Sequence, residues 1–355
     1  MAPLTVLMSC SIIEKDCNGD ILWTWTYPTV SESQKCIITR KCNVQTEYSS
    51  VQSFVCSRHN DNWFYINCSE VFDTDKLPRI KQFALVLFTK DFNPEKYEVL
   101  CRILSKMYCK TGNTTEILKL YLSAYTNGTC TTQENGIFLS DDFDGERSIN
   151  VDGSYIRELI KTFELETILI YTALLLKKRI IIYHHSLEQL LKWIKTIPTL
   201  MTHRRITDNL FPWVDLVSQE IADLKNNLHY VAGCMDSAVS TKVDLYDLLV
   251  NIPAREITIA PHAKDSFTMT KTHKEIALFM VQLCNNHLIT EPQIISEIGE
   301  KTQELLNQLN TLTTIRDNDN SGKVKFCIKK LRECKLSSAV ESFLINLAVA
   351  ENLVM

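Results

Sequence analysis

The chain has 355 residues, and its apolar and charged fractions of 45% and 23% are those of an ordinary globular protein with room for two domains. The net charge of −4 gives no electrostatic reason to expect a nucleic-acid partner, and no long basic run predicts a constitutive membrane anchor. Thirteen cysteines are scattered without paired spacing, which indicates free thiols and a reduced, cytoplasmic protein.

The first 128 residues alternate between strand and helix patterns. The Asn18-Gly19 dipeptide predicts a hairpin, and Asn93-Pro94 predicts a helix start that Gly112 brings to an end. The predicted strands are Leu4–Ile13, Ile21–Tyr27, Val51–Ser57, Trp63–Cys68 and Phe83–Thr89, and the predicted helices are 31–42, Pro94 to about 111, and 115–126. The order β-β-α-β-β-β-α-α predicts one five-stranded sheet with helices packed on it. Trp23 and Trp25 share a strand face, where we expect them to pack against a helix; an exposed docking site is the alternative.

Residues 129–153 are acidic and rich in turn residues, so we expect the boundary between two lobes here. Asp142, Asp144 and Glu146 lie in this segment. They form either a solvated connection or a contact surface, since loops between lobes often carry function.

The stretch 167–185 is the predicted core of the second half. Ile168–Leu176 is apolar on nearly every face and reads as a buried helix, with Lys177 and Lys178 in its last turn. Arg179–Tyr183 reads as a buried strand. The basic residues interrupt the apolar run after roughly half the length of about 20 residues that a membrane span needs.

Helices and apolar strands alternate around this core, and the end of the chain is helical. The expected helices are Tyr155–Phe163, Leu187–Ile197, Glu220–Asn227, His273–Cys284, a helix from Thr290 to about Leu309 and a last helix that opens with a capping box at Ser338–Glu341. The expected strands are His229–Met235, Leu245–Ile252 and Glu256–Ala260, and residues 199–217 are expected to be irregular. This pattern predicts an α/β lobe with a largely buried sheet.

Motifs for covalent or cofactor chemistry are missing from the sequence. There is no phosphate-binding Walker loop, no Gly-x-Gly-x-x-Gly, no Gly-x-Ser-x-Gly and no His-Glu-x-x-His. Asp317–Gly322 begins like a calcium loop, but Ile328 stands where the bidentate glutamate belongs. His184-His185 is expected to be a satisfied strand-edge pair rather than a catalytic or metal site. We therefore expect no catalytic residue, no metal and no cofactor, and a role in binding other proteins.

Several long sequence blocks closely resemble a member of the DENN family, in the same order over nearly the whole chain. They are Lys90–Tyr97, Glu134–Ser140, Asp142–Asp144, Leu174–Ile180, Asp244–Asp247 and Glu256–Lys264. The resemblance implies a bilobal α/β protein with a longin-type lobe at 1–145, a central α/β DENN lobe at 146–265 and a helical downstream segment at 266–355.

The resemblance also implies a function without covalent chemistry, which is guanine-nucleotide exchange on a Rab GTPase in late-endosomal and exosomal trafficking. The alternative is a non-catalytic scaffold subunit that docks on coiled-coil subunits of the Commander endosomal-recycling complex. Either role implies a cytoplasmic protein that reaches late endosomes through its partners. Residues near the lobe boundary are the candidates for the GTPase interface: Lys90, Asp91, Phe92, Asn93, Glu134, Asn135, Asp142, Phe143 and Asp144.

Overall fold

The computed structural model describes residues 3–42, 54–72, 75–132, 136–143, 155–315 and 324–353, with the backbone alone at 314–315 and 324–325. The chain is divided into two compact units, Met1–Ile149 and Asn150–Met355. Within the described ranges, no helix is long and apolar enough to cross a membrane. The finer division of the second unit at residue 265 stays a prediction.

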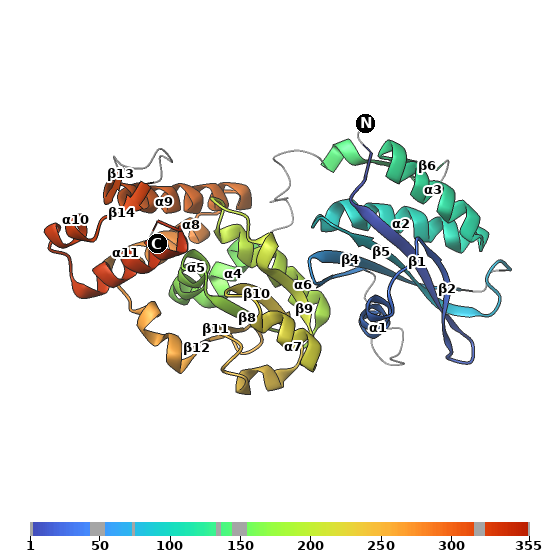
Figure 1. The fold of residues 1–355 in the computed structure, drawn as a ribbon, viewed down its shortest axis with the longest axis horizontal. Helices are drawn as coiled ribbons and strands as arrows, with labels where there is room; N and C mark the ends of the chain where they lie inside the picture. Colours follow the sequence, from blue (N-terminus) through green and yellow to red (C-terminus); the bar gives the residue numbers. More distant parts are fainter. Residues whose placement is uncertain are drawn as a thin grey trace. The chain divides into compact units, whose positions relative to one another are not determined.

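The first unit is built on a five-stranded antiparallel sheet (Figure 1). Its strands are β1 (Leu7–Asp16), β2 (Ile21–Tyr27), β3 (Phe54–His59), β4 (Asn62–Glu70) and β5 (Ile80–Thr89), in the order β2-β1-β5-β4-β3. The predicted strands are therefore confirmed, with shifted ends. The turn between β1 and β2 has Gly19 at φ 94°, a conformation that favours glycine.

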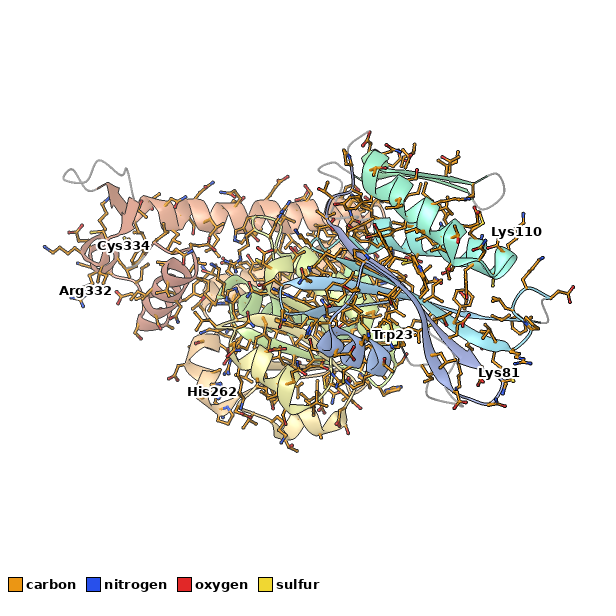
Figure 2. All side chains as sticks on the ribbon, turned by 45° about the vertical axis from the view of Figure 1, so that its right-hand side comes forward. Trp23, Lys81, Lys110, His262, Arg332 and Cys334 are labelled. Carbon is orange, nitrogen blue, oxygen red and sulfur yellow. The ribbon has the colours of Figure 1, made fainter. Side chains whose placement is uncertain are left out.

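Helices cover both faces of this sheet (Figure 1). They are α1 (Glu32–Lys41), α2 (Pro94–Thr111) and α3 (Thr114–Asn127). Trp23 Nε1 donates to Thr39 Oγ1 of α1 at 3.1 Å, so the predicted packing of Trp23 against a helix is confirmed (Figure 2). Tyr108 of α2 donates to Glu14 on the other face of the sheet at 2.5 Å. Because neighbouring residues of a strand point to opposite faces, the sheet is enclosed between α1 and α2.

The segment after α3 contains structure that the sequence did not predict. Strands β6 (Thr129–Thr132) and β7 (Gly136–Leu139) form an antiparallel hairpin, and a short 3₁₀ turn follows at Ser140–Phe143. Cys130 and Phe138 are buried on this hairpin. In the sequence this segment was described only as acidic and turn-rich, because strands of four residues are too short to show a clear alternation.

The second unit is built on a mixed sheet (Figure 1). Its strands are β8 (Arg179–Tyr183), β9 (Leu210–Val214), β10 (Tyr230–Cys234), β11 (Leu248–Asn251) and β12 (Glu256–Ile259), in the order β12-β11-β8-β10-β9. Adjacent strands are parallel except for β11 and β12. The central strand is the predicted one, β8. Strand β9 corrects the expectation of irregular structure at 199–217; it contains Pro212, which is tolerated because β9 lies at the edge of the sheet.

Eight helices lie in the described part of the second unit. They are α4 (Ile156–Phe163), α5 (Thr167–Leu175), α6 (Leu187–Thr196), α7 (Ser218–Lys225), α8 (Lys271–Asn285), α9 (Glu291–Thr311), α10 (Ile328–Glu333) and α11 (Ser338–Ala350). Strands β13 (Thr313–Ile315) and β14 (Val324–Phe326) pair antiparallel. The helical end is joined to the central helices: Ile156 N donates to Glu291 at 2.9 Å, and Tyr171 bonds Thr302 at 2.9 Å.

Two expectations about helix ends were wrong. Helix α5 ends at Leu175, so Lys177 and Lys178 follow the helix rather than forming its last turn. Helix α11 has Ser337 as its N-cap, without a side-chain hydrogen bond, so the capping box predicted at Ser338–Glu341 does not form. The calcium-like segment Asp317–Gly322 lies outside the described residues.

Candidate functional site

The predicted interface residues Lys90–Asn93 form the corner between β5 and α2. The backbone of this corner is held by two tyrosines that burial keeps protonated, since it raises the pKa of Tyr65 and Tyr97. Tyr65 Oη donates to Asp91 O at 3.2 Å and accepts from Asn93 N at 2.9 Å. Tyr97 Oη donates to the carboxylate of Asp91. The Asp91 carboxylate therefore has a structural partner.

Of the other three residues of the corner, two are engaged in contacts within the fold and one is exposed. Phe92 packs on Trp63, with ring centroids 4.3 Å apart, and Asn93 caps α2 by accepting from Lys96 N at 3.1 Å. Lys90 is exposed, and its backbone N donates to Val6 O at 3.0 Å. The corner therefore presents Lys90 from a fixed backbone.

The second predicted segment is described only in part. Asp142 is exposed, and Phe143 is half-buried and stacks on Phe138 at 5.8 Å. The predicted candidates Glu134, Asn135 and Asp144 lie outside the described residues. Among the residues the structure does describe, no hydrogen bond or ring contact joins the Lys90–Asn93 corner to Asp142 or Phe143. The two segments remain separate candidates.

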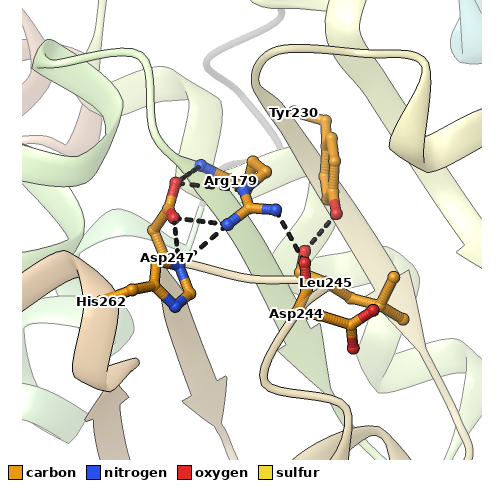
Figure 3. Close-up of polar contacts among 6 residues, drawn as sticks. All are labelled: Arg179, Tyr230, Asp244, Leu245, Asp247 and His262. Carbon is orange, nitrogen blue, oxygen red and sulfur yellow. Dashed lines mark hydrogen bonds and ion pairs between the residues drawn. The ribbon is translucent and has the colours of Figure 1, made fainter.

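A polar network that the sequence did not single out lies at the amino-terminal edge of the second sheet (Figure 3). Asp247 directly precedes β11, and its carboxylate accepts from the backbone N of Arg179 at 2.8 Å and from Arg179 Nη2 at 2.8 Å. His262 Nε2 lies 3.0 Å from Asp247 Oδ1. Arg179 Nη1 also donates to Asp244 O at 2.7 Å, and Tyr230 donates to Leu245 O. We call Arg179, Asp247 and His262 the edge network.

The charges of the edge network are mutually compensated. Burial alone would raise the pKa of Asp247, but the hydrogen bonds from Arg179 and His262 outweigh it and leave the pKa below its ordinary value. The bond to Asp247 likewise raises the pKa of Arg179. A carboxylate that is ionised at neutral pH and bonded to a guanidinium and an imidazole is suited to a structural role. The edge network connects β8, β11 and the segment after β12, and it does not supply a general acid or base.

A signal for the edge network was present in the sequence. Asp247 is a charged residue in the apolar run Leu245–Ile252, and a charge in a buried strand needs a partner. Its partner, Arg179, opens the predicted central strand. The separation of 68 residues hides the pairing until the parallel register of β8 and β11 is known.

The His184-His185 pair lies at the opposite end of β8. The two rings stack at 4.5 Å, and His184 Nδ1 accepts from Ser186 N at 2.9 Å. Burial, followed by the neighbouring charge of His185, lowers the pKa of His184. One ring nitrogen of His184, Nδ1, therefore has a hydrogen-bond partner at the end of the strand.

Metal ligands and reactive thiols do not form a site among the described residues. The residues that the structure describes contain no group of three or more His, Cys, Asp or Glu side chains suited to a metal ion. All thirteen cysteines are free, and Cys10, Cys68, Cys101 and Cys284 are buried as expected. Burial raises the pKa of the Cys10 and Cys101 thiols, which makes them poor nucleophiles.

Comparisons with known proteins identify one family model and several relatives of nearly full length. The family described as SPA, stabilization of polarity axis, matches residues 154–261, which include the second sheet. DENN domain-containing protein 10 of Mus musculus is 37% identical over 98% of this chain and 96% of its own length. The Homo sapiens protein of that name is 36% identical over 99% and 98%, and the Dictyostelium discoideum protein is 32% identical over 97% of each. This chain therefore belongs to the DENN domain-containing protein 10 family.

Proposed function

We propose that the protein binds a Rab GTPase and promotes exchange of its guanine nucleotide in late-endosomal and exosomal trafficking. The observation that carries the proposal is the similarity to DENN domain-containing proteins over nearly the full length of both chains. Under this proposal the protein is cytoplasmic and reaches late endosomes through its partners.

Exchange of this kind needs no covalent step. A factor accelerates release of GDP when it binds the nucleotide-free GTPase more tightly than the GDP-bound form, because only differential affinity shifts an equilibrium between two states. The requirement is a positioned surface rather than an acid, a base or a nucleophile. A fixed surface also suits the task because little conformational freedom is lost on binding.

Lys90 is the candidate contact that the corner between β5 and α2 leaves for a partner. Asp91, Phe92 and Asn93 hold the corner itself, as described above. Substituting them would alter the fold and the surface together. Lys90 is exposed, so its substitution changes the surface charge alone. Asp142 is the corresponding exposed candidate of the second segment.

The test compares the affinity of the full chain for GDP-bound and nucleotide-free Rab GTPases by biolayer interferometry. We expect at least one Rab to bind more tightly without nucleotide. Lys90→Glu should weaken that binding on the order of fivefold, as expected for loss of about 1 kcal/mol at an exposed charge. Lys81→Glu is the matched control, since Lys81 is exposed near the opposite end of β5 (Figure 2). Equal affinities in the two nucleotide states would refute exchange activity.

A scaffold role on coiled-coil subunits of the Commander complex is the second candidate. It is favoured by two exposed leucines in the helical part, Leu278 of α8 at 51% and Leu288 after α8 at 91%. Apolar side chains of this kind can seat against a partner helix. We expect Leu288→Asp to reduce co-purification with the coiled-coil subunits and Leu228→Asp, at a 94% exposed position, to leave it unchanged. Equal capture of both variants would argue against this surface.

A further inference from the structure

A basic hollow lies near the edge network, at the amino-terminal edge of the second sheet. It is small and partly open to solvent, with a cavity volume of about 40 Å³. Three segments supply its basic side chains: the residues after α5, the loop before β9 and the start of β10. These side chains are Lys177, Lys178, Arg204, Arg205 and His229. We call the cavity that they line the basic hollow.

The basic hollow carries an excess of positive charge. No acidic side chain lines it. Arg204 Nη1 pairs with Glu351 at 2.6 Å, and this is the carboxylate that compensates part of the charge. Lys177, Lys178 and Arg205 form no ion pair with any residue that the structure describes. Four permanently charged side chains thus face one carboxylate.

Burial and mutual repulsion both lower the pKa of two of these groups. Burial and then the charge of Arg204 lower the pKa of Lys177. Burial and then the charges of Lys177 and Arg204 lower the pKa of His229. An anion bound among these side chains would relieve the repulsion and replace the water that they lose.

Capping of α5 does not account for the two lysines. Cations near the end of a helix can stabilise its free carbonyl groups. Arg204 already fills that role, because its Nη2 donates to Leu174 O and, at 2.9 Å, to Leu175 O. The side chains of Lys177 and Lys178 make no hydrogen bond to those carbonyls in the described structure.

The backbone conformation at Lys177 is unusual for a residue other than glycine. Lys177 has φ 50°, in the left-handed region, and closes α5 through bonds from Lys177 N to Leu174 O at 3.1 Å and from Lys178 N to Ala173 O at 2.9 Å. This arrangement is a Schellman motif, in which the left-handed position is usually glycine. A lysine is therefore held in a conformation that L side chains rarely adopt, and its side chain lines the basic hollow.

We propose that the basic hollow binds a ligand with several phosphate monoester groups, either a soluble inositol phosphate or the headgroup of a phosphorylated inositol lipid. Lysine and arginine together suit phosphate, which accepts several charge-assisted hydrogen bonds. More than one phosphate is expected because three of the four positive charges are uncompensated, and one phosphate monoester carries a charge of only about −1.5 to −2 at neutral pH. The site lies within the second unit and does not depend on exchange activity.

The test measures binding to the full chain in a phosphate-free buffer at constant ionic strength. The soluble probe is myo-inositol hexakisphosphate, titrated by calorimetry. The membrane probe is a phosphatidylcholine vesicle that contains phosphatidylinositol bisphosphate, which carries two phosphate monoesters, compared by flotation with a vesicle of equal charge made with phosphatidylserine. Binding of the soluble probe without selective recruitment to either vesicle assigns the site to a soluble ligand. Recruitment that is selective for phosphatidylinositol bisphosphate assigns it to a lipid.

We expect the double variant Lys177→Gln, Lys178→Gln to bind the probe at least about tenfold more weakly, because each lysine supplies a charge-assisted hydrogen bond. Arg205→Gln, at an exposed position that cannot affect the core, should also weaken binding. Lys195→Gln with Lys274→Gln is the matched control, since it removes two exposed charges of the same unit. The proposal is overturned when neither probe binds the wild-type chain, or when the control variant loses as much affinity as the double variant.

Discussion

Removal of the Asp247 carboxylate should destabilise the second unit strongly. In Asp247→Ala, the Arg179 guanidinium loses its partner at 2.8 Å while its side chain stays only 25% exposed. Breaking a fully buried ion pair costs about 3–5 kcal/mol, and the residual exposure places this pair near the lower end, at about 3 kcal/mol. For a unit of roughly 200 residues this loss lowers the melting temperature by about 6–12 °C.

Differential scanning calorimetry of the full chain measures this change. Asp244→Ala is the matched control, because the Asp244 side chain is 60% exposed and pairs only with the exposed Lys225, so its loss should cost no more than about 0.5 kcal/mol. The control leaves intact the bond from Arg179 to the backbone of residue 244. A shift for Asp247→Ala as small as that of Asp244→Ala would refute the role of the edge network.

The same variant has a defined pH dependence. The pKa of Asp247 is lower in the folded chain than its unfolded value of about 3.9, so its contribution to stability is complete well above that pH. The contribution is lost as the pH falls through the folded pKa. The stabilities of the wild type and Asp247→Ala should therefore converge in acid, and a constant difference down to low pH would contradict the assignment.

Two further predictions concern other positions of the second unit. Lys177→Gly should stabilise the fold by about 0.5–1 kcal/mol, because relief of left-handed strain exceeds the added flexibility of glycine; a lower melting temperature would contradict this. Burial lowers the pKa of His273 to about 4, so the wild type should lose up to about 3 kcal/mol as the pH falls from about 6.5 to 4. His273→Gln, which can still accept in the cap with Thr270, should lose less over that range in urea titrations, and an identical loss would argue against the buried neutral histidine.

The parts of the fold that were predicted from the sequence rest on local patterns. Asn18-Gly19 and Asn93-Pro94 carry turn and cap preferences that do not depend on distant residues, and both features are present. Arg179–Tyr183 was predicted as a buried strand because its β-branched isoleucines are continuous, and it is the central strand of its sheet.

The missed elements depend on distant partners. Pro212 disfavours a strand locally, and only the edge position of β9 makes it acceptable. The hairpin of β6 and β7 is defined by the pairing of Cys130 with Phe138 rather than by its short strands.

The candidate sites also differ in how far apart their residues lie in the sequence. The Lys90–Asn93 corner is contiguous in the sequence and could be named before the fold was known, and as a GTPase interface it stays a prediction. The edge network joins residues that are 68 and 15 positions apart, and the basic hollow joins three separate segments. Individual residues of these two sites can be noticed in the sequence, as a charge in an apolar run or as a basic pair after a helix. That they lie close together in space becomes known only from the register of the parallel strands.

Release of a fluorescent GDP analogue from a panel of purified Rab GTPases tests the proposed exchange activity most directly. The account predicts that the full chain accelerates release from one or a few Rabs, that Lys90→Glu reduces the acceleration, and that Lys81→Glu leaves it unchanged. Release that stays at the intrinsic rate for every Rab, with the folded full chain present in excess, would contradict the proposed exchange function.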